Sequence, residues 1–325
     1  MFALGWLRSA GVIGSLFVAS GAGPATPSAG CDPPPRPVCE LRDDRITEAS
    51  GLAASRRHPG RYYVHNDSGD TARVFLIDRD GWTCLTIVLT GVTAVDFEDI
   101  ALAPGVAPGA FDVCVADCGD NLARRSEIVI YRFPEPDLPP NADPTAEPAT
   151  HAVTPTAFRW RYADGPADVE ALAVDPLTGD AWLFTKRSDA RTFVYRAAAP
   201  WLASATLPRV AVVDLPAPTG LPGMVTAADI APDGRRLALR TYAGGWEWRL
   251  PEDAPTDAFA RIFHRPPARL VLAAEAQGEA LAYAADGRSL LTVSEGLHPT
   301  LFEVARPAAT TAPTTATAPA ETRTR

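Results

Sequence analysis

The apolar residues of this chain lie in short runs that are separated by turns rich in Pro, Gly, Asp and Asn. Val, Ile, Tyr, Phe and Leu dominate these runs, as in "RVFLID" and "EIVIYRF", and such residues favour β-strands. No segment repeats its apolar positions convincingly at the spacing of an amphipathic helix. The pattern therefore predicts an all-β protein.

One short pattern of small, acidic and apolar residues recurs five times. In each copy a small or acidic residue precedes a branched apolar residue, Ala follows, and most copies then enter a turn. The copies are "EASGLAAS" from Glu48, "DFEDIALAP" from Asp96, "DVEALAVDPLTG" from Asp168, "AADIAPDG" from Ala227 and "GEALAYAADG" from Gly278. The aligned apolar residues, 48 to 72 positions apart, are Leu52, Ile100, Leu172, Ile230 and Leu281.

Further strand-like runs follow most copies, and a fourth run precedes the next copy. Units of four strands with Pro and Gly turns are typical of a β-propeller, and the five copies predict five blades. The last unit lacks a fourth strand after Val304, while "PVCELRD" near the N-terminus has no partner, so we predict that this N-terminal strand closes the ring. The Pro-rich stretch 135–156 is interpreted as a loop insertion, and the alternative is a degenerate sixth blade.

The two ends of the chain do not fit this pattern. Arg8, the apolar run 11–19 and the small residues after it predict a signal peptide over 1–30, because the apolar run is shorter than the roughly 20 residues of a spanning helix. We expect the propeller over 31–305 and a disordered Pro-, Thr- and Ala-rich tail over 306–325. The protein is therefore expected to be secreted, or alternatively to be a lipoprotein anchored through Cys31.

The predicted export and the net charge limit the classes of partner that the protein is expected to bind. Exported cysteines can form disulfides, and the five candidates are Cys31, Cys39, Cys84, Cys114 and Cys118. A net charge of -9 and the absence of any basic run argue against nucleic acid. We expect a monomer without a transmembrane segment that binds a cation, a neutral small molecule or an extracellular partner.

Acidic residues stand where the innermost strand should begin in three of the five blades. The positions two residues before the aligned apolar residues are Ser50, Glu98, Glu170, Ala228 and Glu279. Innermost strands line a propeller's channel, so three glutamates should converge there and repel one another unless a cation neutralises them. Oxygen ligands in a flexible set select a hard cation, calcium before magnesium. We therefore predict a calcium site formed by Ser50, Glu98, Glu170 and Glu279, with Ala228 leaving one side incomplete.

A structural role for the same glutamates is the alternative. They could accept hydrogen bonds from neighbouring blades, or pair with Lys186 or Arg240, and so lock the blades together. We expect the nearby Asp96, Asp99 and Asp168 to be solvated or to cap strands.

Polar residues at the ends of the second strands form a second group near the channel mouth. The candidate ligand-binding residues are Asp67, Asp117, Lys186, Arg240 and Glu295. Asn, Asp and Gly clusters also occur in ordinary hairpin turns, so most of these residues could instead serve only to form turns. Lys186 stands out because it is the only lysine among 30 basic residues.

The motifs "HNDSGD", "DFEDIAL", "DCGDN" and "DVEALAVDPLTGD" together resemble those of exported bacterial propeller proteins described as WD40-like. The resemblance covers Glu48 to roughly Glu303 and implies a propeller without naming a substrate. More distantly, one acidic residue per blade is similar to the calcium-dependent apyrases, which are five-bladed propellers with an axial calcium, and to esterase-like phytase propellers. That likeness implies calcium ligands at Ser50, Glu98, Glu170 and Glu279.

Two classes of function remain. The first is a binding module in which calcium is structural and the channel mouth recognises a ligand or partner. The second is a metal-dependent hydrolase of phosphoesters or lactones, in which Lys186, Arg187 or Arg240 stabilises developing negative charge. The sequence contains no G-x-S-x-G or H-E-x-x-H motif and assigns no catalytic residue, so it leaves enzymatic activity open.

Overall fold

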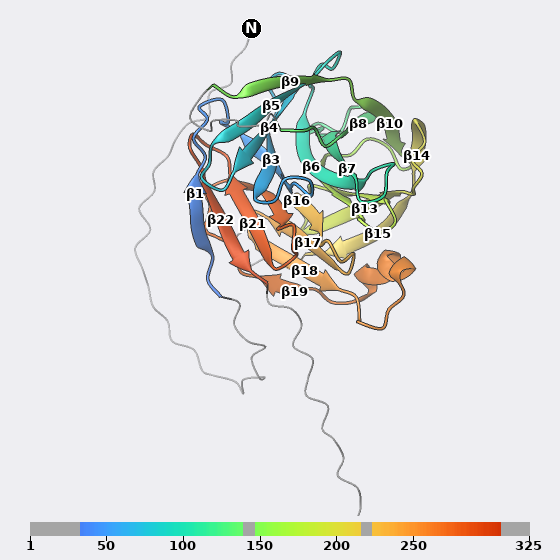
Figure 1. The fold of residues 1–325 in the computed structure, drawn as a ribbon. Helices are drawn as coiled ribbons and strands as arrows, with labels where there is room; N and C mark the ends of the chain where they lie inside the picture. The colour runs from blue at the N-terminus through green and yellow to red at the C-terminus, as the bar shows by residue number, and fades with distance from the viewer. Residues whose placement is uncertain (1–32, 139–146, 216–222, 307–325) are drawn as a thin grey trace, which may run out of the picture. The chain divides into compact units, whose positions relative to one another are not determined.

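A computed structural model describes residues 33–138, 147–215 and 223–306. The predicted signal peptide, Cys31 and the tail beyond Arg306 lie outside the described residues. Within the described part the strands form five sheets arranged as a five-bladed β-propeller, as predicted (Figure 1). A sixth blade is not formed by these residues.

Each blade contains four antiparallel strands, which follow one another in order from the channel to the outer edge. The innermost strands are β2 (Ala49–Ala54), β6 (Phe97–Pro104), β11 (Val169–Val174), β16 (Val225–Ile230) and β20 (Gly278–Tyr283). The second strands are β3 (Arg61–Asn66), β7 (Phe111–Asp117), β12 (Ala181–Thr185), β17 (Arg236–Thr241) and β21 (Ser289–Ser294). The third strands are β4 (Arg73–Asp78), β8 (Ile128–Pro134), β13 (Arg191–Ala197), β18 (Gly244–Arg249) and β22 (Thr300–Ala305). The fourth strands are β5 (Thr83–Leu89), β10 (Thr156–Tyr162), β15 (Arg209–Asp214), β19 (Ala268–Leu270) and β1 (Arg36–Glu40).

The N-terminal strand closes the ring, which confirms the prediction. β1 pairs antiparallel with β22 and so completes blade 5, whose other strands come from the C-terminal end of the propeller. Blades 1 to 4 begin with β2, β6, β11 and β16, and each innermost strand contacts those of the two adjacent blades. The first and last parts of the propeller are therefore held in one sheet.

Three elements are not predicted by the sequence pattern. β9 (Ala149–Val153) lies within the predicted loop insertion and pairs parallel with β5 of blade 1, so the loop interpretation is wrong for these residues. β14 (Ser204–Leu207) pairs parallel with β10 of blade 2 in the same way. A 3-10 helix, η1 (Thr256–His264), interrupts blade 4 between β18 and β19.

The hydrophobic core is divided among the interfaces between blades. Five clusters of buried residues each join two adjacent blades. In β2, Leu52 packs toward blade 5 while Ala53 packs toward blade 2, and Ile100 and Ala101 of β6 alternate in the same sense. This alternation is the period of two of a strand that is buried on both faces. It explains why a branched apolar residue followed by Ala recurs in the sequence.

The described cysteines do not form the predicted disulfides. All four are free, with one partly buried and three buried: Cys39, Cys84, Cys114 and Cys118. No helix among the described residues is long and apolar enough to span a membrane.

Candidate metal centre

Both groups of candidate residues lie at the same mouth of the channel. The start of each innermost strand is paired with the end of the second strand, as in the pairs Phe97 with Asp117 and Val169 with Thr185. Residues just before or within the start of the inner strands therefore face loops that follow the second strands. The two sequence motifs of a blade therefore lie at the same end of the channel.

A β-bulge stands at the start of every innermost strand. In each case the register shifts across one residue, and the five residues are Ser50, Glu98, Glu170, Thr226 and Glu279. Bulges redirect a side chain out of the ladder, and they are frequent beside functional sites. Four of these residues are the predicted calcium ligands. The fifth is Thr226, so the sequence alignment of blade 4 on Ala228 was displaced by two residues.

We define the acidic mouth as the carboxylates that gather at this end of the channel. Its members are Asp67, Asp96, Glu98, Asp168, Glu170, Glu279 and Glu295. Within it, the carboxylates of Asp67, Asp96 and Glu98 offer oxygens that lie within 4.8 Å of one another. A second triad with the same spacing consists of Asp67, Glu279 and Glu295. Asp67 therefore belongs to both triads.

Glu98 and Glu170 form the most deeply buried part of the acidic mouth. Each residue is 2% exposed. Burial raises the pKa of Glu98 well above its ordinary value, and the charges of Glu170, Asp67 and Asp96 raise it further. Gly119, in the "DCGDN" loop, leaves the room for these groups, because a Cβ there would lie 1.9 Å from Glu98 Oε1 and 2.5 Å from Asp96 Oδ2.

Lys186 supplies a positive charge at the mouth and connects two of its glutamates. Its Nζ lies 3.0 Å from Glu170 Oε2 and 5.5 Å from the centre of the Tyr242 ring. Tyr242 in turn donates a hydrogen bond to Glu279 Oε1. Burial lowers the pKa of Lys186, but the charge and hydrogen bond of Glu170, together with Tyr242 and Glu279, outweigh this effect and hold the pKa above its ordinary value. Glu170 Oε1 is buried and has no hydrogen-bond partner among the described residues.

Protons are held more tightly than on free carboxylates at Asp67, Asp96, Glu98, Asp168, Glu170 and Glu295. Burial raises the pKa of Asp67 to about 6, and the charges of Asp96 and Glu279 add to the effect. Burial together with Glu279 raises the pKa of Glu295 to about 8. Burial also raises the pKa of Glu170 to about 7, although Lys186 opposes this shift. Deprotonating the whole set is therefore costly unless a cation enters.

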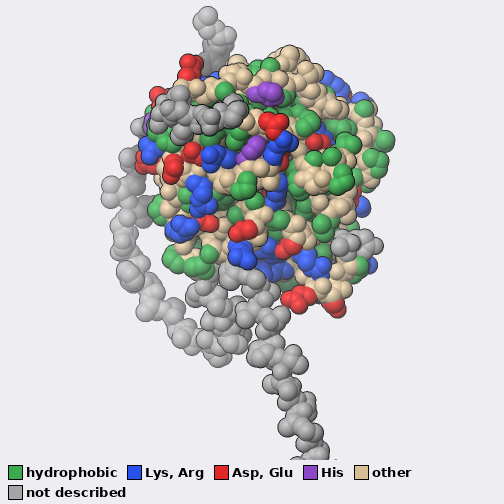
Figure 2. All heavy atoms as spheres, in the orientation of Figure 1, with side chains coloured by type: hydrophobic (Ala, Val, Ile, Leu, Met, Phe, Trp, Pro, Cys, Tyr) green, Lys and Arg blue, Asp and Glu red, His purple; other side chains and the backbone are tan. Residues whose placement is uncertain are grey.

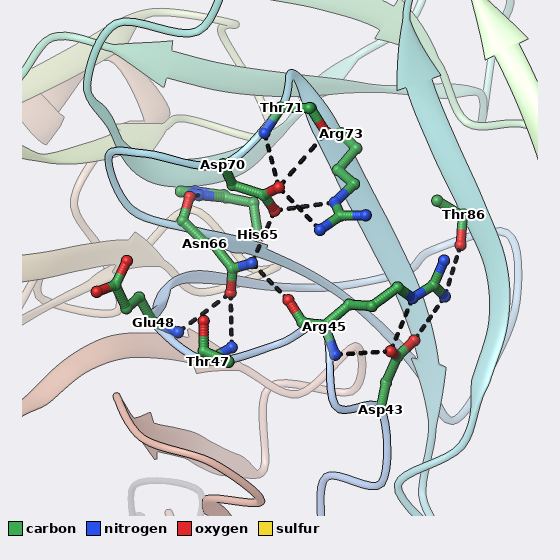
Figure 3. A network of polar contacts seen from close by, with 10 residues as sticks. All are labelled: Asp43, Arg45, Thr47, Glu48, His65, Asn66, Asp70, Thr71, Arg73 and Thr86. Carbon is green, nitrogen blue, oxygen red and sulfur yellow. Dashed lines mark hydrogen bonds and ion pairs between the residues drawn. The ribbon is translucent and has the colours of Figure 1, made fainter.

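Asn66, the residue before Asp67, lies in a network of polar contacts (Figure 3). Asn66 Oδ1 accepts hydrogen bonds from the backbone N–H groups of Thr47 and Glu48, at 3.0 and 3.2 Å. Its Nδ2 donates to the Arg45 carbonyl and to Asp70 Oδ2, both at 2.7 Å. These hydrogen bonds fix the backbone next to Asp67. The motif "HNDSGD" therefore holds a specific loop conformation in addition to forming a turn.

Three further predicted site residues are not members of either triad. The Ser50 hydroxyl donates to the Glu98 carbonyl at 2.7 Å, which ties blade 1 to blade 2. Asp117 pairs with Arg125 at 2.8 Å and accepts backbone N–H groups of the segment that enters β6. Arg240 pairs with buried Glu275 at 2.7 Å. Its guanidinium occupies the space beside Gly278, where a Cβ would lie 1.4 Å from Nη2.

Asp99 was expected to be solvated or to cap a strand, and the expectation of a solvated side chain is wrong. The residue is fully buried. Its Oδ2 accepts backbone N–H groups from Leu172 in blade 3, at 2.9 Å, and from Ala228 in blade 4, at 3.3 Å. One carboxylate from blade 2 therefore joins three blades near the axis. The sequence carries no signal that separates this role from that of its neighbours.

Comparison with known proteins adds no relative to this picture. No model of a protein family matches the chain, and no curated protein matches it. The architecture of a five-bladed β-propeller is shown by the structure, whereas the likeness to WD40-like, apyrase and phytase propellers rests on the sequence motifs alone.

Proposed function

We propose that the acidic mouth binds a hard divalent cation, calcium first, and that the protein is a binding module whose ligand or partner docks at this mouth. The observation that carries the proposal is the pair of carboxylate triads that share Asp67. Three oxygen donors within 4.8 Å of one another suit calcium, whose ligands lie about 2.3–2.6 Å from the ion.

The balance of charge supports a cation at this place. The acidic mouth contains seven carboxylates and one lysine, Lys186, which is paired with Glu170. Like charges this close repel strongly in a partly buried setting, and a divalent ion removes that repulsion. Glu170 Oε1, buried and without a partner among the described residues, offers a further oxygen next to Glu98.

The sequence supports an extracellular setting for this binding. The predicted signal peptide over 1–30 would export the chain, and calcium-binding modules outside the cell commonly have dissociation constants of about 10⁻⁴–10⁻³ M. We therefore propose a secreted protein that is loaded with calcium in its working environment, with a small molecule or an extracellular partner as ligand.

Thermal unfolding of the purified mature chain tests the metal proposal. We expect calcium added after EDTA treatment to raise the melting temperature, because an ion that binds only the folded state stabilises it. Asp67→Asn should abolish this rise, since Asp67 belongs to both triads, while Asp214→Asn on an exposed part of β15 should retain it. An equal calcium response in wild type and Asp67→Asn would contradict the proposal.

A metal-dependent hydrolase is the second candidate. It is favoured by Glu170, whose pKa of about 7 suits a general acid or base, and by its buried Oε1, which has no hydrogen-bond partner among the described residues. A panel of phosphoester and lactone substrates tests this candidate on the same sample. Turnover that disappears with EDTA and with Glu170→Gln would favour the hydrolase over the binding module.

A further inference from the structure

A cavity of about 340 Å³ lies between blades 4 and 5, at the ends of β16 and β20 that are far from the acidic mouth. Five arginines line it: Arg235, Arg236, Arg249, Arg288 and Arg306. Figure 2 shows Lys and Arg side chains gathered in the lower part of the face in view, where Figure 1 places β17, β18 and β19. Such a concentration of positive charge is unusual in a chain with a net charge of -9.

Internal carboxylates neutralise only part of this charge. Fully buried Glu247 accepts hydrogen bonds from Arg249 and Arg306, and Asp233 pairs with Arg236 at 3.0 Å. Asp286 and Glu252 also line the cavity, but neither forms an ion pair with a described residue. Five arginines and four carboxylates leave a net charge of +1 at the cavity, and Arg235 and Arg288 are the two arginines without an ion pair to a described residue.

Arg235 is held in place by groups that carry no formal charge. Its Nη2 donates to the backbone carbonyls of Pro251, Glu252 and Ala254, while Nε and Nη1 make no hydrogen bond to the described residues. Arg288 is exposed, and its guanidinium has no partner among the described residues. Donors that are already positioned and not yet satisfied are what an anion site requires.

We propose that this cavity binds a tetrahedral oxyanion, either phosphate or sulfate, free or as the charged end of a small organic ester. Arg binds such groups through two parallel N–H donors, and several guanidiniums around one cavity match their charge and geometry. Glu247 and Asp233 keep Arg249 and Arg236 in position, so the ligand would enter without breaking these pairs. The site is independent of the acidic mouth.

Isothermal titration of the mature chain with sodium sulfate and sodium phosphate tests this proposal. Sodium chloride holds the ionic strength constant, so that general screening does not imitate binding. We expect one saturable site in wild type and about tenfold weaker binding in Arg288→Gln, the loss of one charge-assisted hydrogen bond. Arg288 is exposed, and its guanidinium has no partner within the described ranges, so this variant should fold normally. Arg288→Lys keeps the positive charge but loses the two parallel N–H donors of the guanidinium, so it should bind with intermediate affinity.

Two controls identify the cavity as the binding site. Arg124→Gln removes an exposed arginine from a loop of blade 2 and should leave the affinity unchanged. Glu252→Gln removes a competing carboxylate from the cavity and should tighten binding by about twofold. Glycerol phosphate distinguishes a free oxyanion from an organic ester as the ligand. If glycerol phosphate binds more tightly than inorganic phosphate, the ligand is an organic ester. No saturable binding, or equal losses in Arg288→Gln and Arg124→Gln, would overturn the proposal.

Discussion

Lys186 is the residue on which the charge of the acidic mouth depends. Its ammonium lies 3.0 Å from Glu170 Oε2, and its side chain is only 18% exposed. A compact ammonium fits between Glu170 and Tyr242, which gives a structural reason for a single lysine among 30 basic residues. Lys186 neutralises one glutamate and leaves the two triads for another cation.

Lys186→Gln should destabilise the metal-free protein at pH 8 by about 2–3 kcal/mol, since it removes the positive charge that stabilises the ionised carboxylate of buried Glu170. At pH 5 the loss should be smaller, because Glu170, with a pKa of about 7, is then protonated in both variants. Urea unfolding in EDTA at the two pH values measures both effects, with Lys186→Arg as the control that keeps the charge. A loss of stability that is the same at both pH values would contradict this role.

The raised pKa values of the mouth predict how stability depends on pH. Asp67, Glu170 and Glu295 have folded-state pKa values of about 6, 7 and 8, above the unfolded values of about 4. The folded state therefore binds protons more tightly, so these groups contribute stability that is present at low pH and lost as the pH rises from about 4 to 8. Calcium needs the deprotonated carboxylates, so its stabilising effect should grow over the same range.

Melting temperatures in EDTA and in calcium, recorded from pH 5 to pH 8, check this pH dependence. The difference between the two curves should widen toward pH 8. A difference that stays constant across this range would mean that the carboxylates of the mouth do not bind the ion.

At the scale of the elements, the bulge at the start of each innermost strand performs two different tasks. In blades 2, 3 and 5 it carries a glutamate into the mouth, and in blades 1 and 4 it carries a hydroxyl. The hydroxyls of Ser50 and Thr226 each donate to a carbonyl of the next blade, Glu98 at 2.7 Å and Gly278 at 3.1 Å. We therefore expect the hydroxyls to hold blades together and the glutamates to face the ion.

Ser50→Ala and Thr226→Ala should each lower stability by about 1 kcal/mol, the contribution of one buried hydrogen bond. Neither should change the response to calcium, whereas Glu98→Gln should weaken it. Thermal unfolding of the three variants with and without calcium separates the two tasks. If Ser50→Ala weakened the calcium response as much as Glu98→Gln, Ser50 would be a ligand, as the sequence predicts.

The sequence predicts these elements well where the pattern is dictated by the core. Leu52 and Ile100 recur with Ala after them because each inner strand is buried against two blades. Prediction from the sequence fails where tertiary pairing decides the structure. The largely exposed strands β9 and β14 form because they pair with the edges of β5 and β10. The alignment of blade 4 failed because Ala228 takes the place of a larger apolar residue.

At the scale of the whole molecule, contacts that join distant blades give the ring its form. β1 completes blade 5, and Asp99 links blades 2, 3 and 4 through two backbone N–H groups. The position of Asp67 also depends on the ring, because its two triads draw residues from blades 1, 2 and 5. The sequence could indicate glutamates at strand starts, but only the closed ring brings Asp67 between them.

Calcium titration of the metal-free mature chain by isothermal calorimetry tests the central claim most directly. We predict saturable binding with a dissociation constant of about 10⁻⁴–10⁻³ M in wild type and in Asp214→Asn, and its loss in Asp67→Asn. Absence of saturable binding in wild type, or unchanged binding in Asp67→Asn, would show that the acidic mouth is not a calcium site.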